Sequence, residues 1–305
     1  MCDSITAKYR EVLDSFIKKI KEDRLVIAAI LAGSLYHDKV WRKSDIDLIL
    51  IVDDPKKPYK FHSLIENDII INTGIYDRSQ FKREYESALE SSSWILKSTL
   101  LFSKDETLND LLGRLSVIAD NDRDLLLLRY GTLSVAGLAK SQKFLYIKQD
   151  PLYSMYMAQR NLVNELASIE VLLNGGVPFR EVVDQALSIH PQFFNSVYTQ
   201  LLQLHKDENV MDSMLRLIES YLEERTMVLF RLILDILQEA GMEVAMSEIH
   251  RKLSRANIDP ALLAEACEWL VEKKVIQKLS SPVRLTTKSR MQVDEAAYYY
   301  EGGNQ

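Results

Sequence analysis

Residues 25–52 read LVIAAILAGSLYHDKVWRKSDIDLILIV. The run from Leu25 to Leu31 is short, apolar and rich in β-branched residues, and it stops at Gly33-Ser34, which predicts a buried strand followed by a tight turn. Ten residues separate Ser34 from Asp45, and Asp45 and Asp47 begin a second apolar run, Ile46 to Val52. The stretch therefore predicts two buried strands whose connection carries Gly-Ser at its start and Asp-x-Asp at its end.

The two carboxylates share one face of the second strand, because side chains alternate along a strand with a period of two. Paired oxygen ligands of this kind suit a pair of Mg²⁺ ions over a reacting phosphate. A glycine lets a phosphate oxygen approach the backbone amide, and a serine adds a neutral donor. We therefore take Asp45 and Asp47 as candidate catalytic and metal-binding residues, and Gly33 and Ser34 as candidate nucleotide-binding residues.

Gly-Ser followed by Asp-x-Asp resembles the signature of the DNA polymerase β-like nucleotidyltransferase superfamily. The segments Ile71–Phe81 and Trp94–Asp105 are similar in layout to kanamycin nucleotidyltransferase and to bacterial nucleotidyltransferase-like proteins with a C-terminal winged helix. The resemblance covers the catalytic domain well and the rest only in architecture. It implies an NTP bound at Gly33 and Ser34 and two Mg²⁺ ions on the aspartates. It also implies an unknown hydroxyl acceptor that attacks the α-phosphorus, release of pyrophosphate, and a homodimer.

Members of the superfamily take a third carboxylate from the next core strand. In the segment Ile69–Tyr76 the nearest equivalent is Asn72, and Asp68 is the acid that shares its face by alternation. An asparagine offers a neutral carbonyl to a cation but cannot act as a general base. The third position is therefore assigned to Asn72 or Asp68, with weaker metal binding expected for Asn72.

Kanamycin-type enzymes also draw a glutamate base from their helical domain. The helix predicted from Leu125 to Lys143 contains no Asp or Glu, so Glu165 and Glu170 on the following helix become the candidate general bases. The alternative is that both glutamates lie on a solvent-exposed helix pair. Lys140, Lys143 and Lys148 form a basic side that would either meet a triphosphate or face solvent.

The pattern along the chain predicts an α+β fold in three domains. Residues 1–118 form a small mixed-sheet nucleotidyltransferase domain, residues 119–226 an all-helical substrate-binding bundle, and residues 227–305 a winged helix with a tail. Trp94–Phe102 is expected to be a strand or a buried helix. Asp150-Pro151 caps a long helix ending at Asn174. In the last domain, Val275–Leu279 and Val283–Thr287 are expected to form a hairpin around Ser281-Pro282.

The C-terminal module is locally basic. Residues 242–291 hold nine Lys or Arg against six Asp or Glu, whereas the whole chain has a net charge of −6. Contact with DNA would use the basic side chains Arg251, Lys252, Arg255, Arg284, Lys288 and Arg290. Glu265, Glu268 and Glu272 on the expected recognition helix oppose that contact, so a protein partner is an equal alternative.

Composition sets the remaining limits. The net charge of −6 argues against indiscriminate nucleic-acid binding, and the two cysteines show no metal-binding spacing. No signal peptide or membrane span is evident, so we expect a cytoplasmic protein without membrane contact. Two hypotheses follow. One is a Mg²⁺-dependent nucleotidyltransferase, and the other is a catalytically silent relative that acts as a regulator or scaffold through its winged helix.

Overall fold

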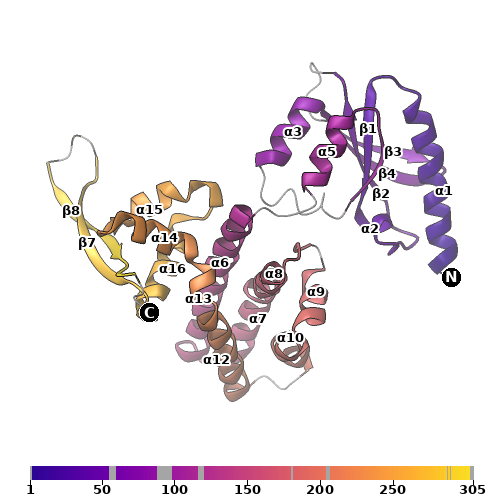
Figure 1. The fold of residues 1–305 in the computed structure, drawn as a ribbon. Helices are drawn as coiled ribbons and strands as arrows, with labels where there is room; N and C mark the ends of the chain where they lie inside the picture. Colours follow the sequence, from indigo (N-terminus) through magenta and orange to yellow (C-terminus); the bar gives the residue numbers. More distant parts are fainter. Residues whose placement is uncertain are drawn as a thin grey trace. The chain divides into compact units, whose positions relative to one another are not determined.

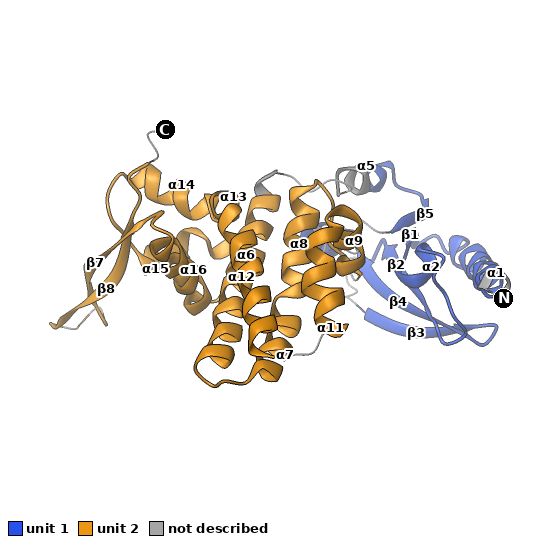
Figure 2. Ribbon diagram, turned by 90° about the horizontal axis from the view of Figure 1, so that it is seen from below, with its two compact units in different colours: residues 1–118 blue, residues 119–305 orange. Residues whose placement is uncertain are grey.

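The computed structural model describes residues 2–54, 60–87, 98–115, 120–179, 181–203, 207–286, 288 and 290–302. The chain forms two compact units, residues 1–118 and residues 119–305 (Figure 2). The further division of the second unit at residue 226 stays a prediction. Each unit is described by itself below.

Unit 1 is built on a mixed five-stranded sheet in the order β3-β4-β2-β1-β5. The strands are β1 (Val26–Ala32), β2 (Ile46–Val52), β3 (Lys60–Glu66), β4 (Ile69–Asp77) and β5 (Thr99–Ser103). The pair β2/β4 is parallel, and β1/β2, β3/β4 and β1/β5 are antiparallel. The predicted α+β class with a mixed sheet is confirmed. Residues 94–97 of the expected fourth strand lie outside the described residues.

Strand β3 has no counterpart among the elements expected from the sequence. It joins β4 through the two-residue turn Asn67-Asp68, where both residues have left-handed backbone angles, with φ of 48° and 63°. Such turns match the twist of the strands that they connect, and Asn and Asp tolerate the conformation better than most residues. The hairpin adds an edge strand beside β4.

Helices cover both faces of the sheet (Figure 1). The apolar stripe of α1 (Cys2–Lys21), which includes Tyr9 and Phe16, packs on β1, β2 and β4 from one side. Phe81 of α3 (Arg78–Ser87) and Leu108 of α5 (Glu106–Leu115) pack on the other side, against Ile49 and its neighbours. Asp45 and Asp47 have odd numbers like Ile49, so they belong to the α3/α5 face.

Unit 2 is a helical bundle around one long central helix. Helix α6 (Asp120–Tyr146) contacts α7 (Pro151–Asn161), α8 (Val163–Leu173), α12 (Glu208–Glu224), α13 (Thr226–Leu229), α14 (Arg231–Ala240) and α16 (Pro260–Glu272). Buried residues occur around much of its circumference, as expected of a helix enclosed by others. Between α8 and α12 the chain forms α9 (Val182–Ile189), α10 (Pro191–Phe194), a π-helical turn over Asn195–Gln200 and α11 (Leu201–Gln203).

The helix expected from Pro151 to Asn174 is interrupted. Asp150 caps it as predicted, since its Oδ1 accepts from the Tyr153 amide at 2.9 Å. The chain breaks at Leu162, whose φ of −128° is not helical, and continues as α8. Helix α8 ends before Gly175, which has a φ of +75°. The break gives α7 and α8 separate contacts with α6.

The C-terminal part of unit 2 follows the order α14, β6 (Val244–Ala245), α15 (Met246–Lys252), a 3₁₀ turn over Ser254–Ala256, α16, β7 (Gln277–Arg284) and β8 (Gln292–Tyr299). Its three strands form a sheet in the order β6-β8-β7. The predicted hairpin around Ser281-Pro282 is wrong, because both residues lie inside β7 and pair with β8. β7 is an edge strand, where the missing N–H of Pro282 breaks no ladder.

In the part of the chain that the structure describes, no helix combines the length and apolar character needed to cross a membrane.

Candidate functional site

Strand β1 ends directly against the Asp47 side chain. Ala32 pairs with Asp47 across β1 and β2, and the next residue, Gly33, has a left-handed φ of +73°. A Cβ added at Gly33 would lie 3.0 Å from Cγ of Asp47 and would overlap its Oδ2 atom. Two features therefore require a glycine here: the left-handed backbone angle, and the Asp47 carboxylate that fills the position where a Cβ would lie. The short helix α2 (Gly33–Tyr36) starts here.

Asn72 joins the two aspartates. It pairs with Asp47 in the parallel register of β2 and β4, and its Nδ2 donates to Oδ2 of Asp45 at 2.5 Å. Its own Oδ1 accepts from the Ser63 hydroxyl of β3 at 2.8 Å. The structure thus brings Gly33, Asp45, Asp47 and Asn72 together, and Ser63 fixes the direction of the Asn72 amide.

A cavity of about 330 Å³ opens over Gly33, Asp47 and Asn72. Its lining includes Gly33, Asp47, Asn72, Phe61 and Tyr76. The Phe61 side chain is exposed, and its partner across the β3/β4 pair is Gly74, so no side chain of that partner covers the ring. Ser63 and Phe61 were not expected as site residues. Their sequence signal was the Asn67-Asp68 turn, which marks a hairpin and so a strand before it.

The comparisons with known proteins bear on the fold. No family model matches the chain, and no curated protein sequence matches it. Among solved structures it is similar to the crystal structure of a nucleotidyltransferase-like protein from Exiguobacterium sibiricum 255-15. The TM-score is 0.62 at 17% identity, and the match covers 96% of this chain and 99% of the other. The chain has a nucleotidyltransferase-like fold. The closer resemblance to kanamycin nucleotidyltransferase stays a prediction.

Within this nucleotidyltransferase-like fold, α1 supports the site from the face of the sheet opposite to α3 and α5. The Tyr9 hydroxyl donates to the backbone carbonyl of Ser44 at 2.8 Å, which holds the residue before Asp45. Burial, and next the negative charge of Asp45, raise the pKa of Tyr9. Tyr9 therefore stays a neutral donor at physiological pH.

Asp68 does not reach the other site residues. It lies in the exposed β3/β4 turn, four residues before Asn72, which corresponds to about 13 Å along an extended strand. Of the two residues proposed for the third position, the structure brings only Asn72 to the aspartates.

Glu170 lies on α8 in unit 2 and is buried, so the alternative of a solvent-exposed position is wrong for it. Its Oε2 accepts from the Tyr221 hydroxyl at 2.7 Å, and its Oε1 accepts from the Asn174 amide at 3.2 Å. Arg225 and His190 lie 3.8 and 3.6 Å from the same Oε2. These contacts tie α8 to α12, so the carboxylate already serves the packing of the bundle.

Glu165, also on α8, is half-buried and lies in different surroundings. Its Oε2 atom is buried and has no hydrogen-bond partner in the described part of the chain. Burial raises the pKa of Glu165. A raised pKa suits a general base that works near neutral pH, and that role stays a prediction.

The donor set at Asp45 and Asp47 fits a divalent cation that also binds substrate phosphate. Mg²⁺ in such sites is commonly held by one or two carboxylates and completes its shell with phosphate oxygens and water. Among the described residues, no group of three or more His, Cys, Asp or Glu surrounds a common point. The amide of Asn72 is turned toward Asp45 and Ser63. The number of cations at the site stays a prediction.

Proposed function

We propose that this protein is a nucleotidyltransferase that moves a nucleoside monophosphate from an NTP to a hydroxyl group. The observation that carries the proposal is the packing of Gly33 against the Asp47 carboxylate in the cavity, with Asp45 hydrogen-bonded to Asn72, which also lines that cavity. A glycine at this position brings an anion-binding turn and a cation-binding carboxylate within one phosphate group of each other. The nucleotidyltransferase-like fold supports the same activity.

In the proposed reaction the acceptor oxygen attacks the α-phosphorus, and the bond from the α-phosphorus to the oxygen that bridges it to the β-phosphorus breaks. Pyrophosphate leaves with that oxygen, and the hydroxyl proton passes to a base. Ser34 and the Gly33 amide bind the outer phosphates. Asn72 keeps Asp45 in place but cannot accept the proton, because an amide nitrogen is not basic. Glu165 is the proposed base.

Asp45 and Asp47 are the proposed ligands of Mg²⁺. When bound, the cation neutralises charge on the phosphates and on the leaving group. The two ions implied by the superfamily remain part of the proposal, with the second ion held mostly by phosphate and water. Because Asn72 is neutral, we expect weaker cation binding than in a site with three carboxylates.

The test is calorimetric titration of non-hydrolysable NTP analogues in the presence of Mg²⁺. Asp45→Asn keeps an oxygen that can accept from Asn72, so it removes charge with little change in shape. Asp53→Asn, an exposed carboxylate just after β2, is the matched control. We expect Mg²⁺-dependent binding in the wild type and in Asp53→Asn, and its loss in Asp45→Asn. Equal binding in all three proteins, or none in the wild type, contradicts the proposal.

A second candidate function is a silent nucleotidyltransferase-like regulator or scaffold. Asn72 favours it, because the neutral amide occupies the third carboxylate position and already satisfies Asp45. We propose that α14, β6, α15, α16, β7 and β8 form a winged helix and that this module carries the interaction; the order of these elements supports the proposal. The homodimer implied by the resemblance is likewise a proposal.

The basic side chains of this module divide into two groups. Arg251 pairs with Glu248 at 2.6 Å, and Arg255 with Asp122 at 3.5 Å. Arg284, Lys288 and Arg290 at the β7/β8 end form no ion pair within the described residues. We therefore assign the proposed DNA contact mainly to these three side chains. Each lost phosphate contact should lower the salt dependence of binding by a slope of about one.

Fluorescence anisotropy with duplex DNA separates the candidates. If the regulator is correct, the wild type binds DNA without consuming NTP, and the triple change to glutamine at 284, 288 and 290 weakens binding more than Arg251→Gln. Binding that is equal in both variants contradicts a role for the wing. A protein partner would instead leave DNA unbound at physiological salt.

A further inference from the structure

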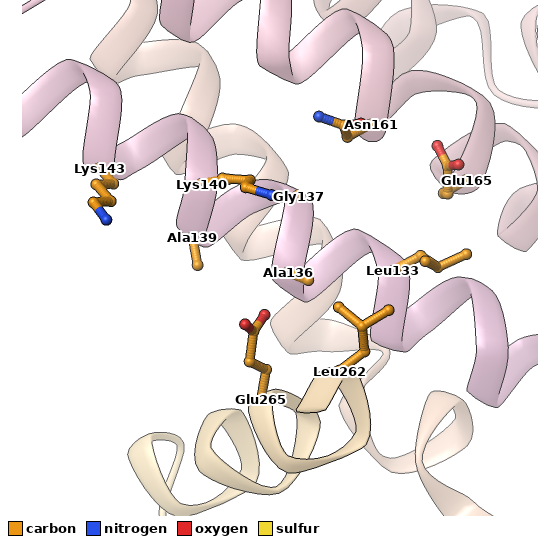
Figure 3. A pocket seen from close by; sticks show the side chains of 10 residues that line it. All are labelled: Leu133, Ala136, Gly137, Ala139, Lys140, Lys143, Asn161, Glu165, Leu262 and Glu265. Carbon is orange, nitrogen blue, oxygen red and sulfur yellow. The ribbon is translucent and has the colours of Figure 1, made fainter. Parts of the chain in front are cut away.

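A second cavity lies wholly inside unit 2, between α6, the α7/α8 junction and α16 (Figure 3). Its volume is about 370 Å³, which is within the size range of small-molecule sites. The lining residues are Leu133, Ala136, Gly137, Ala139, Lys140, Lys143, Asn161, Glu165, Leu262 and Glu265. The cavity is therefore bounded by both the bundle and the C-terminal module.

Small residues on α6 make room for this cavity. A Cβ at Gly137 would lie 2.5 Å from the carbonyl oxygen of Asn161 and 3.1 Å from the Leu162 side chain. The α7/α8 junction therefore packs directly on the backbone of α6 at this point. The short side chains of Ala136 and Ala139 leave unfilled volume next to α6, and longer side chains surround that volume.

Four of the lining side chains are titratable, two of each sign. Figure 3 shows Glu265 reaching toward α6 from α16, with Lys140 and Lys143 on α6 and Glu165 on the far wall. Within the described part of the chain, none of the four forms an ion pair. Among the residues that the structure describes, Glu165 has no hydrogen-bond donor apart from its own backbone amide, and its Oε2 is buried. A buried polar atom without a partner calls for a ligand, an ion or a water.

Glu165 and the two lysines occupy different parts of the cavity. Figure 3 places Glu165 opposite Leu133 of α6. Lys140 lies seven residues further along α6, or about 10 Å between the Cα atoms. Glu165 thus lies in the less exposed part near apolar Leu133, and the lysines and Glu265 lie at the exposed end. A dianion would be repelled by Glu165 and Glu265, and a dication by the lysines.

We propose that this cavity binds a small zwitterion, with an ammonium group facing Glu165 and a carboxylate facing Lys140 and Lys143. The ammonium supplies the donors that Glu165 lacks, and the carboxylate pairs with the lysines. The separation of the two charged walls requires a short chain between the charged groups, as in an ω-amino acid. The proposal shares Glu165 with the base of the proposed transfer reaction, and the ligand would contact both α6 and α16.

The test uses the full chain and three probes of one length: 5-aminopentanoate, pentylamine and pentanoate. Affinity is measured by calorimetry and checked by the shift in Tm. We expect 5-aminopentanoate to bind at least tenfold more tightly than either single-charge probe. Glu165→Gln should remove its advantage over pentanoate, and Lys140→Gln its advantage over pentylamine. Lys148→Gln and Glu272→Gln, exposed residues outside the cavity, should bind like the wild type.

Three results would overturn the proposal. The first is equal affinity for the three probes, the second is pentanoate or pentylamine alone binding as tightly as the zwitterion, and the third is an equal loss in the control variants. Glu165→Gln removes a poorly solvated charge, so it should fold, and its Tm without probe checks this. Repeating the titration with Asp45→Asn shows that the result does not depend on the nucleotide site.

Discussion

Replacing Gly33 by alanine tests the geometry of the candidate site most directly. The new Cβ would lie 3.0 Å from Cγ and 3.2 Å from Cβ of Asp47, whereas ordinary contacts begin at 3.4 Å, and it would overlap Oδ2. The carboxylate must therefore swing away by about 1 Å. Mg²⁺ holds its oxygen ligands at about 2.1 Å, so a shift of this size removes one of two protein ligands. Disturbing the support of a metal ligand typically costs about 10- to 100-fold in affinity.

The same substitution also strains the backbone, and a matched variant separates the two effects. Gly175 has a φ of +75°, close to the +73° of Gly33, but nothing lies within 4 Å of an added Cβ. Both alanines should lower the free energy of unfolding by about 1–2 kcal/mol, which is the cost of a left-handed residue with a side chain. Only Gly33→Ala should lose affinity for an NTP analogue with Mg²⁺, by at least about tenfold. Equal nucleotide affinity in the two variants would show that Gly33 does not position Asp47.

Three further predictions concern single side chains. Asn72→Asp should lower the Tm without metal, because a third carboxylate replaces the donor to Asp45, and Mg²⁺ should then raise the Tm more than in the wild type; an unchanged response to Mg²⁺ refutes this. Burial raises the pKa of Glu165. The protonated carboxyl group therefore contributes its full stability below the ordinary pKa of a glutamate, near 4.5, and that contribution is lost as pH rises through the raised pKa. Urea unfolding should therefore show Glu165→Gln gaining stability over the wild type between pH 4 and pH 8, whereas a constant difference contradicts it. Tyr221→Phe removes the hydroxyl that donates to Oε2 of the buried Glu170 and should cost about 2 kcal/mol by the same assay, and no loss would mean that another group replaces the hydroxyl.

The sequence predicts those parts of the site in which the chemistry requires particular residue types at a fixed spacing within one short segment. Gly33, Asp45 and Asp47 follow from residue type and spacing, and Asn72 follows from the alternation of β4. The sequence pattern does not predict strand β3, because it is an edge strand with mostly exposed residues and so has no apolar run. For the same reason the sequence does not predict Ser63 as a site residue, although its hydroxyl orients Asn72.

Burial of a charged residue by distant partners is harder to predict. Glu170 has the local pattern of a helix glutamate, and its partners Tyr221 and Arg225 lie on and after α12, more than fifty residues later. The misplaced hairpin has a different cause. Pro282 is a strong turn signal, but it also fits an edge strand, and only the pairing with β8 distinguishes the two.

Asn72 has consequences for both candidate functions. Three carboxylates at one point repel one another and depend on a cation to hold them together. Here the Asn72 amide donates to Asp45, so one repulsion is replaced by an attraction and the site keeps its geometry without metal. The same exchange removes one negative charge and weakens the attraction for a free cation. A cation is then held mainly when phosphate oxygens complete its shell, so nucleotide and metal should bind together. A site of this kind can bind nucleotide as an enzyme or as a sensor, and proton removal, which Asn72 cannot perform, is the step that separates the two.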